Sequence, residues 1–120
     1  MTPENQVPTQ ATSQALADAE IKFDSYFSWY TFEDLLPEVE ITGSYLQGLS
    51  APTAQELLEK MPSRIENVGY LESTTDKPDH TAAYVYLSYG GLETTKSIRH
   101  KNLAEALAQM CLWLKEKGYL

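Results

Sequence analysis

The stretch from Ala82 to Tyr119, AAYVYLSYGGLETTKSIRHKNLAEALAQMCLWLKEKGY, decides the fold of this chain. Its first part, Ala82 to Tyr89, is rich in tyrosine and valine, which favours a β-strand. Gly90 and Gly91 supply the positive φ angles of a tight two-residue turn, and Leu92 to Arg99 then returns as a second strand. The sequence therefore predicts a β-hairpin.

A helix over residues 103 to 117 follows this hairpin. Asn102 can cap its first turn, and Glu105 stands three residues later, as in a capping box. Gly118 ends the helix, because glycine readily adopts the left-handed conformation found at helix C-termini. Apolar side chains recur at three- and four-residue steps and so share one helical face: Leu103, Ala106, Leu107, Met110 and Leu114.

Two further elements complete a module over residues 50 to 120. The segment Thr53-Ala-Gln-Glu-Leu-Leu58 starts with a capping box, and Pro62 stops the helix that it begins. Ile65 to Glu72 is expected to be a strand, and the polar run Ser73 to His80 a loop. The predicted fold is therefore α+β: a three-stranded antiparallel meander with helices packed on one face, in the order α-β-β-β-α.

The first half of the chain follows other patterns. Residues 1 to 11 are mostly polar and contain two prolines, so we expect a flexible tail. Residues 12 to 49 form an acidic, aromatic-rich extension. Its apolar positions from Leu16 to Tyr30 favour a helix, with a strand near Phe23 as the alternative. Thr31-Phe-Glu-Asp-Leu-Leu36 repeats the later T-x-x-acid-Leu-Leu pattern, either by duplication or because the same helix-start chemistry is used twice.

The net charge of −8 comes entirely from the first half of the chain. Residues 1 to 60 carry ten acids and two lysines, whereas residues 61 to 120 carry seven acids and seven bases. This balance repels phosphate backbones, so direct nucleic-acid binding is not expected. An acidic surface can instead attract basic proteins, or mimic nucleic acid towards them.

Several classes of protein are excluded by composition and missing motifs. The single cysteine, Cys111, cannot form an internal disulfide, and no apolar run approaches transmembrane length. The N-terminal MTPENQVPTQ lacks the basic and apolar regions of a signal peptide, so we expect a cytoplasmic protein without a membrane partner. None of G-x-G-x-x-G, G-x-S-x-G and H-E-x-x-H occurs, and no cofactor is expected.

The second half resembles small uncharacterised proteins encoded by bacteriophages and prophages of gut bacteria. The resemblance rests on Thr53-x-x-Glu-Leu-Leu58, Met61-Pro62 and Ile65, on the strands after them, and above all on the closing run from Asn102 to Leu120. It covers about residues 50 to 120 and does not extend to the first 50 residues. It implies a helix, three strands and a helix, and a mobile-element origin, but no activity.

Candidate catalytic and metal-binding residues are few. Asp76, Asp79 and His80 place two carboxylates and an imidazole within five residues, but a metal site needs at least three converging ligands, and a solvated loop explains the same residues. Cys111 could pair with His80 or His100, although a cysteine on the inner flank of a helix is typically a small buried hydrophobe. Gly91 to Ser97 matches a phosphate loop only by chance, because it follows a hairpin turn.

Candidate partner-binding surfaces are more numerous. Tyr84 and Tyr86 share one strand face, which is a candidate surface for a partner, while the opposite face, with Ala83, Val85, Leu87 and Tyr89, is expected to be core. Tyrosines also fill half-exposed sheet positions without any partner. The acids between residues 18 and 40 form the other candidate surface: Asp18, Glu20, Asp24, Glu33, Asp34, Glu38 and Glu40.

Leu112 lies opposite the main apolar face of the final helix, and Trp113 lies at the edge of that face. Leu112 would be left in water if this helix packed only on the sheet. A further layer, either the N-terminal segment or a second copy of the chain, would cover it.

The function that these features favour is a non-enzymatic protein–protein interaction module of phage or prophage origin. One alternative is an acidic inhibitor that mimics nucleic acid towards a basic host protein, whose binding would collapse in high salt. A second alternative, a small metal-dependent hydrolase, requires Asp76, Asp79 and His80 to converge.

Overall fold

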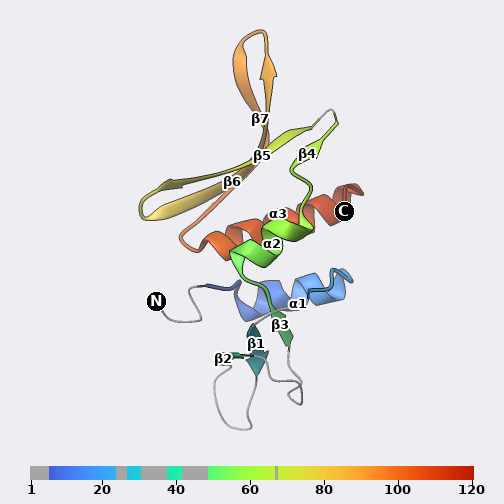
Figure 1. Cartoon of the computed structure of the whole chain (residues 1–120), viewed down its shortest axis with the longest axis vertical. Helices are drawn as coiled ribbons and strands as arrows, with labels where there is room; N and C mark the ends of the chain where they lie inside the picture. Colours follow the sequence, from blue (N-terminus) through green and yellow to red (C-terminus); the bar gives the residue numbers. More distant parts are fainter. Residues whose placement is uncertain (1–5, 24–26, 31–37, 42–48, 67) are drawn as a thin grey trace.

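The computed structural model describes residues 6–23, 27–30, 38–41, 49–66 and 68–120. The chain is α+β, as predicted. Its described part contains the helices α1 (Gln10–Asp18), α2 (Ala54–Lys60) and α3 (Leu103–Lys117) and two antiparallel sheets (Figure 1). Within that part of the chain, none of the helices has the length and apolar character needed to span a membrane.

The main sheet has four strands, in the order β4-β5-β6-β7, where three were predicted. The single strand expected over Ile65 to Glu72 is instead split into β4 (Arg64–Ile65) and β5 (Gly69–Asp76), which pair antiparallel. The chain reverses between Ile65 and Gly69, and β5 begins at Gly69, whose φ of 126° is one that glycine adopts without strain. The extra strand therefore comes from a tight reversal inside the predicted one.

The polar run Ser73 to His80 is not a loop, and this prediction is wrong. β5 continues to Asp76 and pairs with β6 (Asp79–Ser88) up to the Asp76–Asp79 pair, so only Lys77 and Pro78 form the turn. Threonines occupy both strands here, Thr74 opposite Thr81, and their β-branched side chains suit an extended backbone even where they face water.

The β-hairpin predicted over Ala82 to Arg99 is confirmed, and its turn lies one residue earlier than predicted. β7 (Gly91–His100) pairs with β6 from Ser88–Gly91 to His80–His100, which leaves Tyr89 and Gly90 in the turn. Gly91, with a φ of 111°, begins the returning strand.

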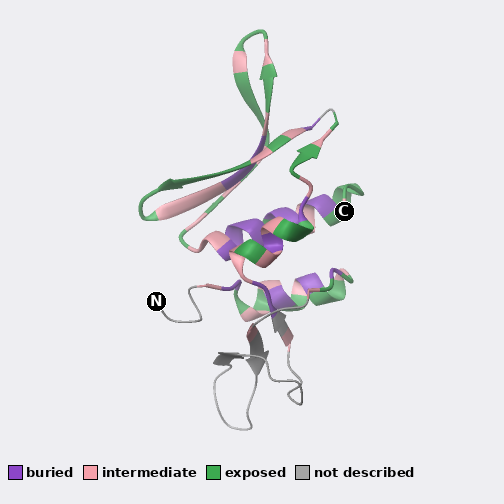
Figure 2. Cartoon of the chain, viewed as in Figure 1, coloured by how far each residue is buried: buried purple, intermediate pink, exposed green. Residues whose placement is uncertain are grey.

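α3 has the predicted bounds and lies at the centre of the molecule. The side chain of Asn102 accepts a hydrogen bond from the Glu105 backbone N–H, and Gly118 ends the helix in the left-handed conformation. α2 lies beside α3 on the same face of the main sheet, and α1 packs on the side of α3 away from that sheet (Figure 1). Because α3 is enclosed from two sides, its buried residues surround it (Figure 2).

The N-terminal half departs most from the sequence predictions. The helix favoured over Leu16 to Tyr30 ends at Asp18, and a smaller sheet follows, in the order β2-β1-β3, made of β1 (Phe27–Tyr30), β2 (Glu38–Ile41) and β3 (Leu49–Ala51). The strand that local alternation indicates near Phe23 occurs four residues later, in β1. The repeat Thr31 to Leu36 lies outside the described residues.

The prediction of a flexible tail over residues 1 to 11 is wrong for residues 6 to 11. Val7 is fully buried, its carbonyl accepts a hydrogen bond from Asn102 Nδ2 at 2.7 Å, and α1 already begins at Gln10. Burial of one aliphatic side chain and capping of α1 by Thr9 thus fix residues 6 to 11 to α3. Residues 1–5 lie outside the described part of the chain.

The central strand β6 changes surroundings halfway along its length. Thr95 of β7 is an extra residue in the ladder, because Tyr84 pairs with Lys96 and Val85 with Thr94. Such a bulge increases the local bend and twist. Before it, β6 lies over the helices; beyond it, the β6–β7 hairpin projects from the body and forms one end of a molecule measuring 56 × 31 × 20 Å (Figure 1).

Candidate interaction surface

Tyr84 belongs to the core, so the prediction that it lies on an exposed face is wrong. Its ring is fully buried and stands 6.3 Å, centroid to centroid, from the Trp113 ring. Its hydroxyl donates a hydrogen bond of 2.7 Å to the Pro62 carbonyl, which offsets the loss of water around the phenol. Burial of this hydroxyl raises the pKa of Tyr84 to about 12.

Leu112 and Trp113 are both half-buried and pack against the main core. Trp113 lies between Tyr84 and Tyr119, whose ring centroid is 5.9 Å from its own. Leu112 stands seven residues after Glu105, on the same side of α3, and Glu105 contacts α1. The N-terminal layer that we predicted as one cover for Leu112 is therefore present.

The opposite face of β6, predicted to be core, becomes solvent-exposed beyond the bulge. Val85 and Leu87 point away from the side of Tyr84, two cross-strand partners, Tyr70 and Leu92, share their face, and Tyr89 follows in the exposed turn. Leu87 is 79% exposed, Leu92 71% and Tyr70 56%. We call these five residues the apolar stripe.

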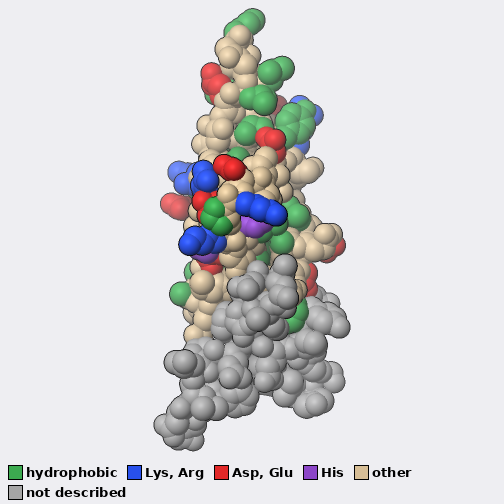
Figure 3. All heavy atoms as spheres, turned by 90° about the vertical axis from the view of Figure 1, so that its left-hand side faces the viewer, with side chains coloured by type: hydrophobic (Ala, Val, Ile, Leu, Met, Phe, Trp, Pro, Cys, Tyr) green, Lys and Arg blue, Asp and Glu red, His purple; other side chains and the backbone are tan. Residues whose placement is uncertain are grey.

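The apolar stripe contains no charged side chain. It runs from the base of the projecting hairpin to its turn, and hydrophobic side chains are visible at the surface of this end of the molecule (Figure 3). At its base the guanidinium of Arg64 lies 5.5 Å from the centroid of the Tyr70 ring. This is a cation–π contact at the edge of an otherwise uncharged surface.

The other face of the same hairpin is polar and internally bonded. The Tyr86 hydroxyl and the Ser88 hydroxyl both donate to the Glu93 carboxylate, and Tyr86 is 39% exposed. The hydrogen bond from Tyr86, and then that from Ser88, lowers the pKa of Glu93. Of the two tyrosines that we predicted for a partner, Tyr86 alone reaches solvent, on the face opposite the stripe.

The acidic candidate surface is described only in part. Asp18 and Glu20 are exposed at the end of α1, where Asp18 accepts a hydrogen bond of 2.9 Å from Gln14. Glu38 and Glu40 are placed in β2 by their backbone. Three other acids that we predicted for this surface lie outside the described residues: Asp24, Glu33 and Asp34.

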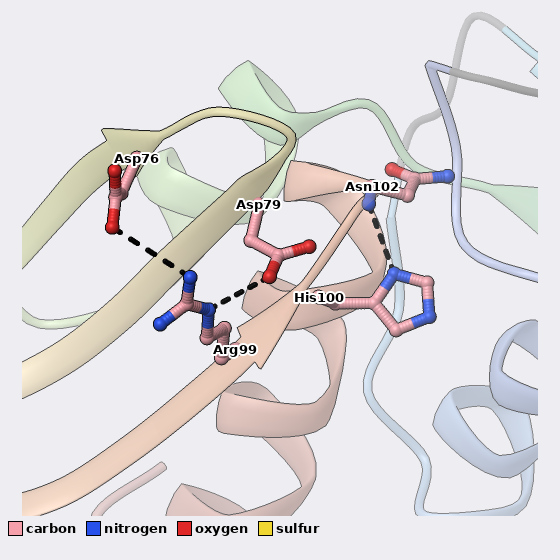
Figure 4. A network of polar contacts seen from close by, with 5 residues as sticks. All are labelled: Asp76, Asp79, Arg99, His100 and Asn102. Carbon is pink, nitrogen blue, oxygen red and sulfur yellow. Dashed lines mark hydrogen bonds and ion pairs between the residues drawn. The ribbon is translucent and has the colours of Figure 1, made fainter.

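Asp76, Asp79 and His80 do not converge on a metal site. Both carboxylates face Arg99, at 2.8 Å from its Nε to Asp79 and 3.6 Å from its Nη2 to Asp76 (Figure 4). His80 Nδ1 lies 3.0 Å from the Thr75 hydroxyl instead. Across the residues that the structure describes, no group of three or more His, Cys, Asp or Glu side chains could hold a metal ion.

The remaining catalytic candidates, Cys111 and His100, and the phosphate-loop match have positions that the fold accounts for. Cys111 is fully buried, and desolvation raises the pKa of its thiol to about 12, so the thiolate is not accessible at neutral pH. His100 Nδ1 accepts a hydrogen bond of 2.9 Å from the Asn102 N–H, just before α3 (Figure 4). Gly91 to Ser97, the chance phosphate-loop match, is part of strand β7.

Glu105 is a buried polar residue that the sequence pattern did not distinguish. The predicted capping box is incomplete, because its carboxylate accepts from α1 rather than from the Asn102 N–H: 2.8 Å from the Thr9 N–H and 2.6 Å from the Thr12 hydroxyl. Gln109 donates a third hydrogen bond, of 2.8 Å. Burial acts to raise the pKa of Glu105, but these hydrogen bonds outweigh it and lower the pKa.

A groove of about 630 Å³ lies between the first turns of α2 and α3. Its described lining combines apolar side chains with neutral amides, and with His80 and Lys101. The described lining residues include neither a carboxylate nor a thiol. The apolar stripe therefore remains the surface that most needs explanation.

No protein-family model, curated protein or solved structure matches this chain. Its function is therefore inferred from the geometry of the described residues.

Proposed function

We propose that this chain is a non-enzymatic protein–protein interaction module of the phage or prophage type, and that it binds through the apolar stripe. The observation that carries the proposal is an uncharged row of large side chains on a projecting hairpin, with Leu87 and Leu92 more than two-thirds exposed. The mobile-element origin rests only on the resemblance of residues 50 to 120 to proteins encoded by phages and prophages.

The stripe is a ready source of binding free energy. Covering a leucine or tyrosine side chain in an interface contributes on the order of 1 to 2 kcal/mol, and contiguous exposed apolar patches are typical of interaction sites. Tyr70 and Tyr89 add large contact area with few rotatable bonds. Leu87 and Leu92, which are cross-strand partners, would form the centre of the contact.

The hairpin is also suited to present the stripe rigidly. β6 runs without interruption from the buried Ala82 and Tyr84 into the projecting half, so the core anchors the strand that carries Val85 and Leu87. On the other face, the Glu93 carboxylate already has hydrogen-bond donors within the hairpin. Little conformational entropy would be lost when the stripe is covered.

Capture of partners by the immobilised full chain tests the proposal. We expect specific proteins from a bacterial lysate to be retained by the wild type and lost from the double variant Leu87→Ser/Leu92→Ser, both at low salt and at about 500 mM NaCl, where charge interactions are largely screened. Tyr119→Ser is the matched control, since Tyr119 is also a partly exposed aromatic residue but lies after α3.

Two results would contradict the proposal. One is equal capture by the wild type and the double variant. The other is capture that survives the double substitution at low salt but disappears at high salt, because this is the behaviour of an acidic nucleic-acid mimic. Circular dichroism of both variants would establish that each has folded.

A further inference from the structure

We infer that the partner of the apolar stripe is a second copy of this chain, with two hairpins packed stripe to stripe about a two-fold axis. The inference rests on the proposed function, which requires only that the stripe binds a protein. It adds the identity of that protein, and it depends on where the charges lie relative to the stripe.

The charge distribution favours self-association through the hairpin. The stripe belongs to the neutral half of the sequence, whereas the surplus of eight acids lies in residues 1 to 60. The small sheet formed by β1, β2 and β3 from that acidic half lies at the end of the long axis opposite the hairpin (Figure 1). The long axis measures 56 Å, far beyond the screening length of about 8 Å at physiological ionic strength.

Two copies joined at their hairpins therefore keep their acidic halves apart. Contact through the small sheet would instead bring Glu38 and Glu40 of β2 close to the same acids of the second copy. On the face that Figure 3 shows, acidic and basic side chains are intermixed over the middle of the molecule, so this face adds little net repulsion. Of the two ends, the hairpin end is the one at which a second acidic copy can approach.

The composition of the stripe is self-complementary. In a two-fold interface the same patch faces itself, so charged patches repel, whereas apolar patches attract without directional requirements. An antiparallel arrangement would also bring the turn residue Tyr89 of each copy to the base of the other hairpin, where Arg64 already stacks on Tyr70. The stripe offers hydrogen bonds only through the hydroxyls of Tyr70 and Tyr89, so a polar surface of a different partner would lose water with little compensation.

The face of the hairpin, rather than its edge, is the contact surface. β7 is the edge strand of the main sheet, but the bulge at Thr95 interrupts its ladder. Bulges and charged side chains, here Lys96 and Arg99, are features that oppose pairing of one sheet edge with another. Five side chains provide less than the roughly 800 Å² per partner of a standard interface, so we expect a dimer in the micromolar range.

Sedimentation equilibrium of the full chain tests the inference. The wild type is expected to show a monomer–dimer equilibrium whose dissociation constant changes little as NaCl rises from about 50 to about 500 mM, because the contact is uncharged and the acidic halves lie beyond the screening length of each other. Leu87→Ser/Leu92→Ser should raise that constant about tenfold or more, and Tyr119→Ser should leave it unchanged.

A cysteine cross-link gives an independent measurement. Cys111 is buried, so a short bis-maleimide reports on an introduced thiol. Leu92→Cys should give cross-linked dimers that increase with protein concentration. Thr74→Cys, an exposed position on the same sheet face near the other hairpin, should stay monomeric.

The outcomes separate this inference from the proposed function. A wild type that stays monomeric up to about 1 mM at both salt concentrations, or equal dimerisation by wild type and double variant, overturns the second-copy inference. If the wild type is monomeric but the double variant loses captured proteins, the interaction module stands and its partner is a different chain. If the double substitution changes neither measurement, both proposals fail.

Discussion

Helix α3 and the outer half of the β6–β7 hairpin both carry large apolar side chains, but only α3 is covered. Leu107, Met110 and Leu114 have no exposed surface, whereas Leu87 and Leu92 are mostly in water. Both segments have a clear apolar face in the sequence. The difference teaches that an apolar face marks a surface to be covered, and that the rest of the chain decides whether it is covered within one molecule.

The largest expected effect contrasts one leucine from each region. Leu107→Ala should lower the free energy of unfolding by about 3 kcal/mol, because it leaves a cavity in a closely packed core. Leu92→Ala removes a side chain that is already hydrated and should change it by less than about 0.5 kcal/mol. Urea unfolding at micromolar protein concentration measures both; similar losses would mean that the stripe is covered within the monomer.

Gly69, the first residue of β5, packs against Val85 of β6 at the base of the projecting hairpin. A Cβ atom at this position would lie 2.2 Å from the Val85 carbonyl oxygen, and the φ of 126° is unfavourable for any other residue. Gly69→Ala should therefore cost about 2 to 4 kcal/mol. Gly90→Ala is the matched control in the hairpin turn, where the nearest atom is 3.9 Å away, and it should unfold like the wild type. Equal stability of Gly69→Ala and wild type would show that the bend of β6 is not built on this close approach.

The attachment of α1 to α3 predicts a pH dependence. The folded pKa of Glu105 lies below its unfolded value of about 4.3, so its ionised carboxylate stabilises the fold above that pH, and this contribution disappears as the pH falls through the folded pKa. Glu105→Gln should cost about 1 to 2 kcal/mol at pH 7, since one amide oxygen replaces two carboxylate oxygens as acceptor.

The difference between wild type and Glu105→Gln should shrink as the pH is lowered to about 3. Urea unfolding at both pH values measures it, and other acids such as Glu93 cancel because both proteins carry them. A difference that stays constant with pH would mean that the charge of Glu105 does not hold the body together.

The smallest effect concerns the other hairpin, formed by β5 and β6. Arg99→Gln removes the ion pairs with Asp76 and Asp79, but Arg99 is more than half exposed, so the loss should be below about 1 kcal/mol. Thermal unfolding at low and high salt measures it. A larger loss would show that this hairpin, unlike the apolar one, relies on its charges.

The fold could be predicted where local chemistry is decisive. Asn102 and Gly118 delimit α3 because caps act on the adjacent backbone, and Thr53 starts α2 for the same reason. The split at Gly69 could not be foreseen, because it depends on the approach of β5 to the Val85 carbonyl from another strand. The full length of β5 could not be predicted for a related reason: its polar threonines look like a loop until a partner strand pairs with them.

For the candidate surface, the sequence predicted which side chains share a strand face but not which of them are exposed. Strand periodicity placed Tyr84 and Tyr86 on one face and Val85 and Leu87 on the other, and that division holds. The exposure was predicted wrongly for Tyr84, which is buried, and for Leu87, which is exposed, whereas Ala83 is buried as expected. The prediction assumed that the more apolar face of a strand is the buried one along its whole length. Pro62 supplies a carbonyl to the Tyr84 hydroxyl, and no local pattern announces a partner 22 positions away in the sequence.

By itself, the sequence determined the α+β class, the bounds of α3, the β6–β7 hairpin and the confinement of the net charge to the first half. These features depend on interactions between near neighbours and on simple composition. Only the tertiary structure decided that Tyr84 is buried, that Glu105 binds α1, and that the apolar stripe remains in water. Each of these depends on which distant segment covers a given face, and that is settled by the packing of the whole chain.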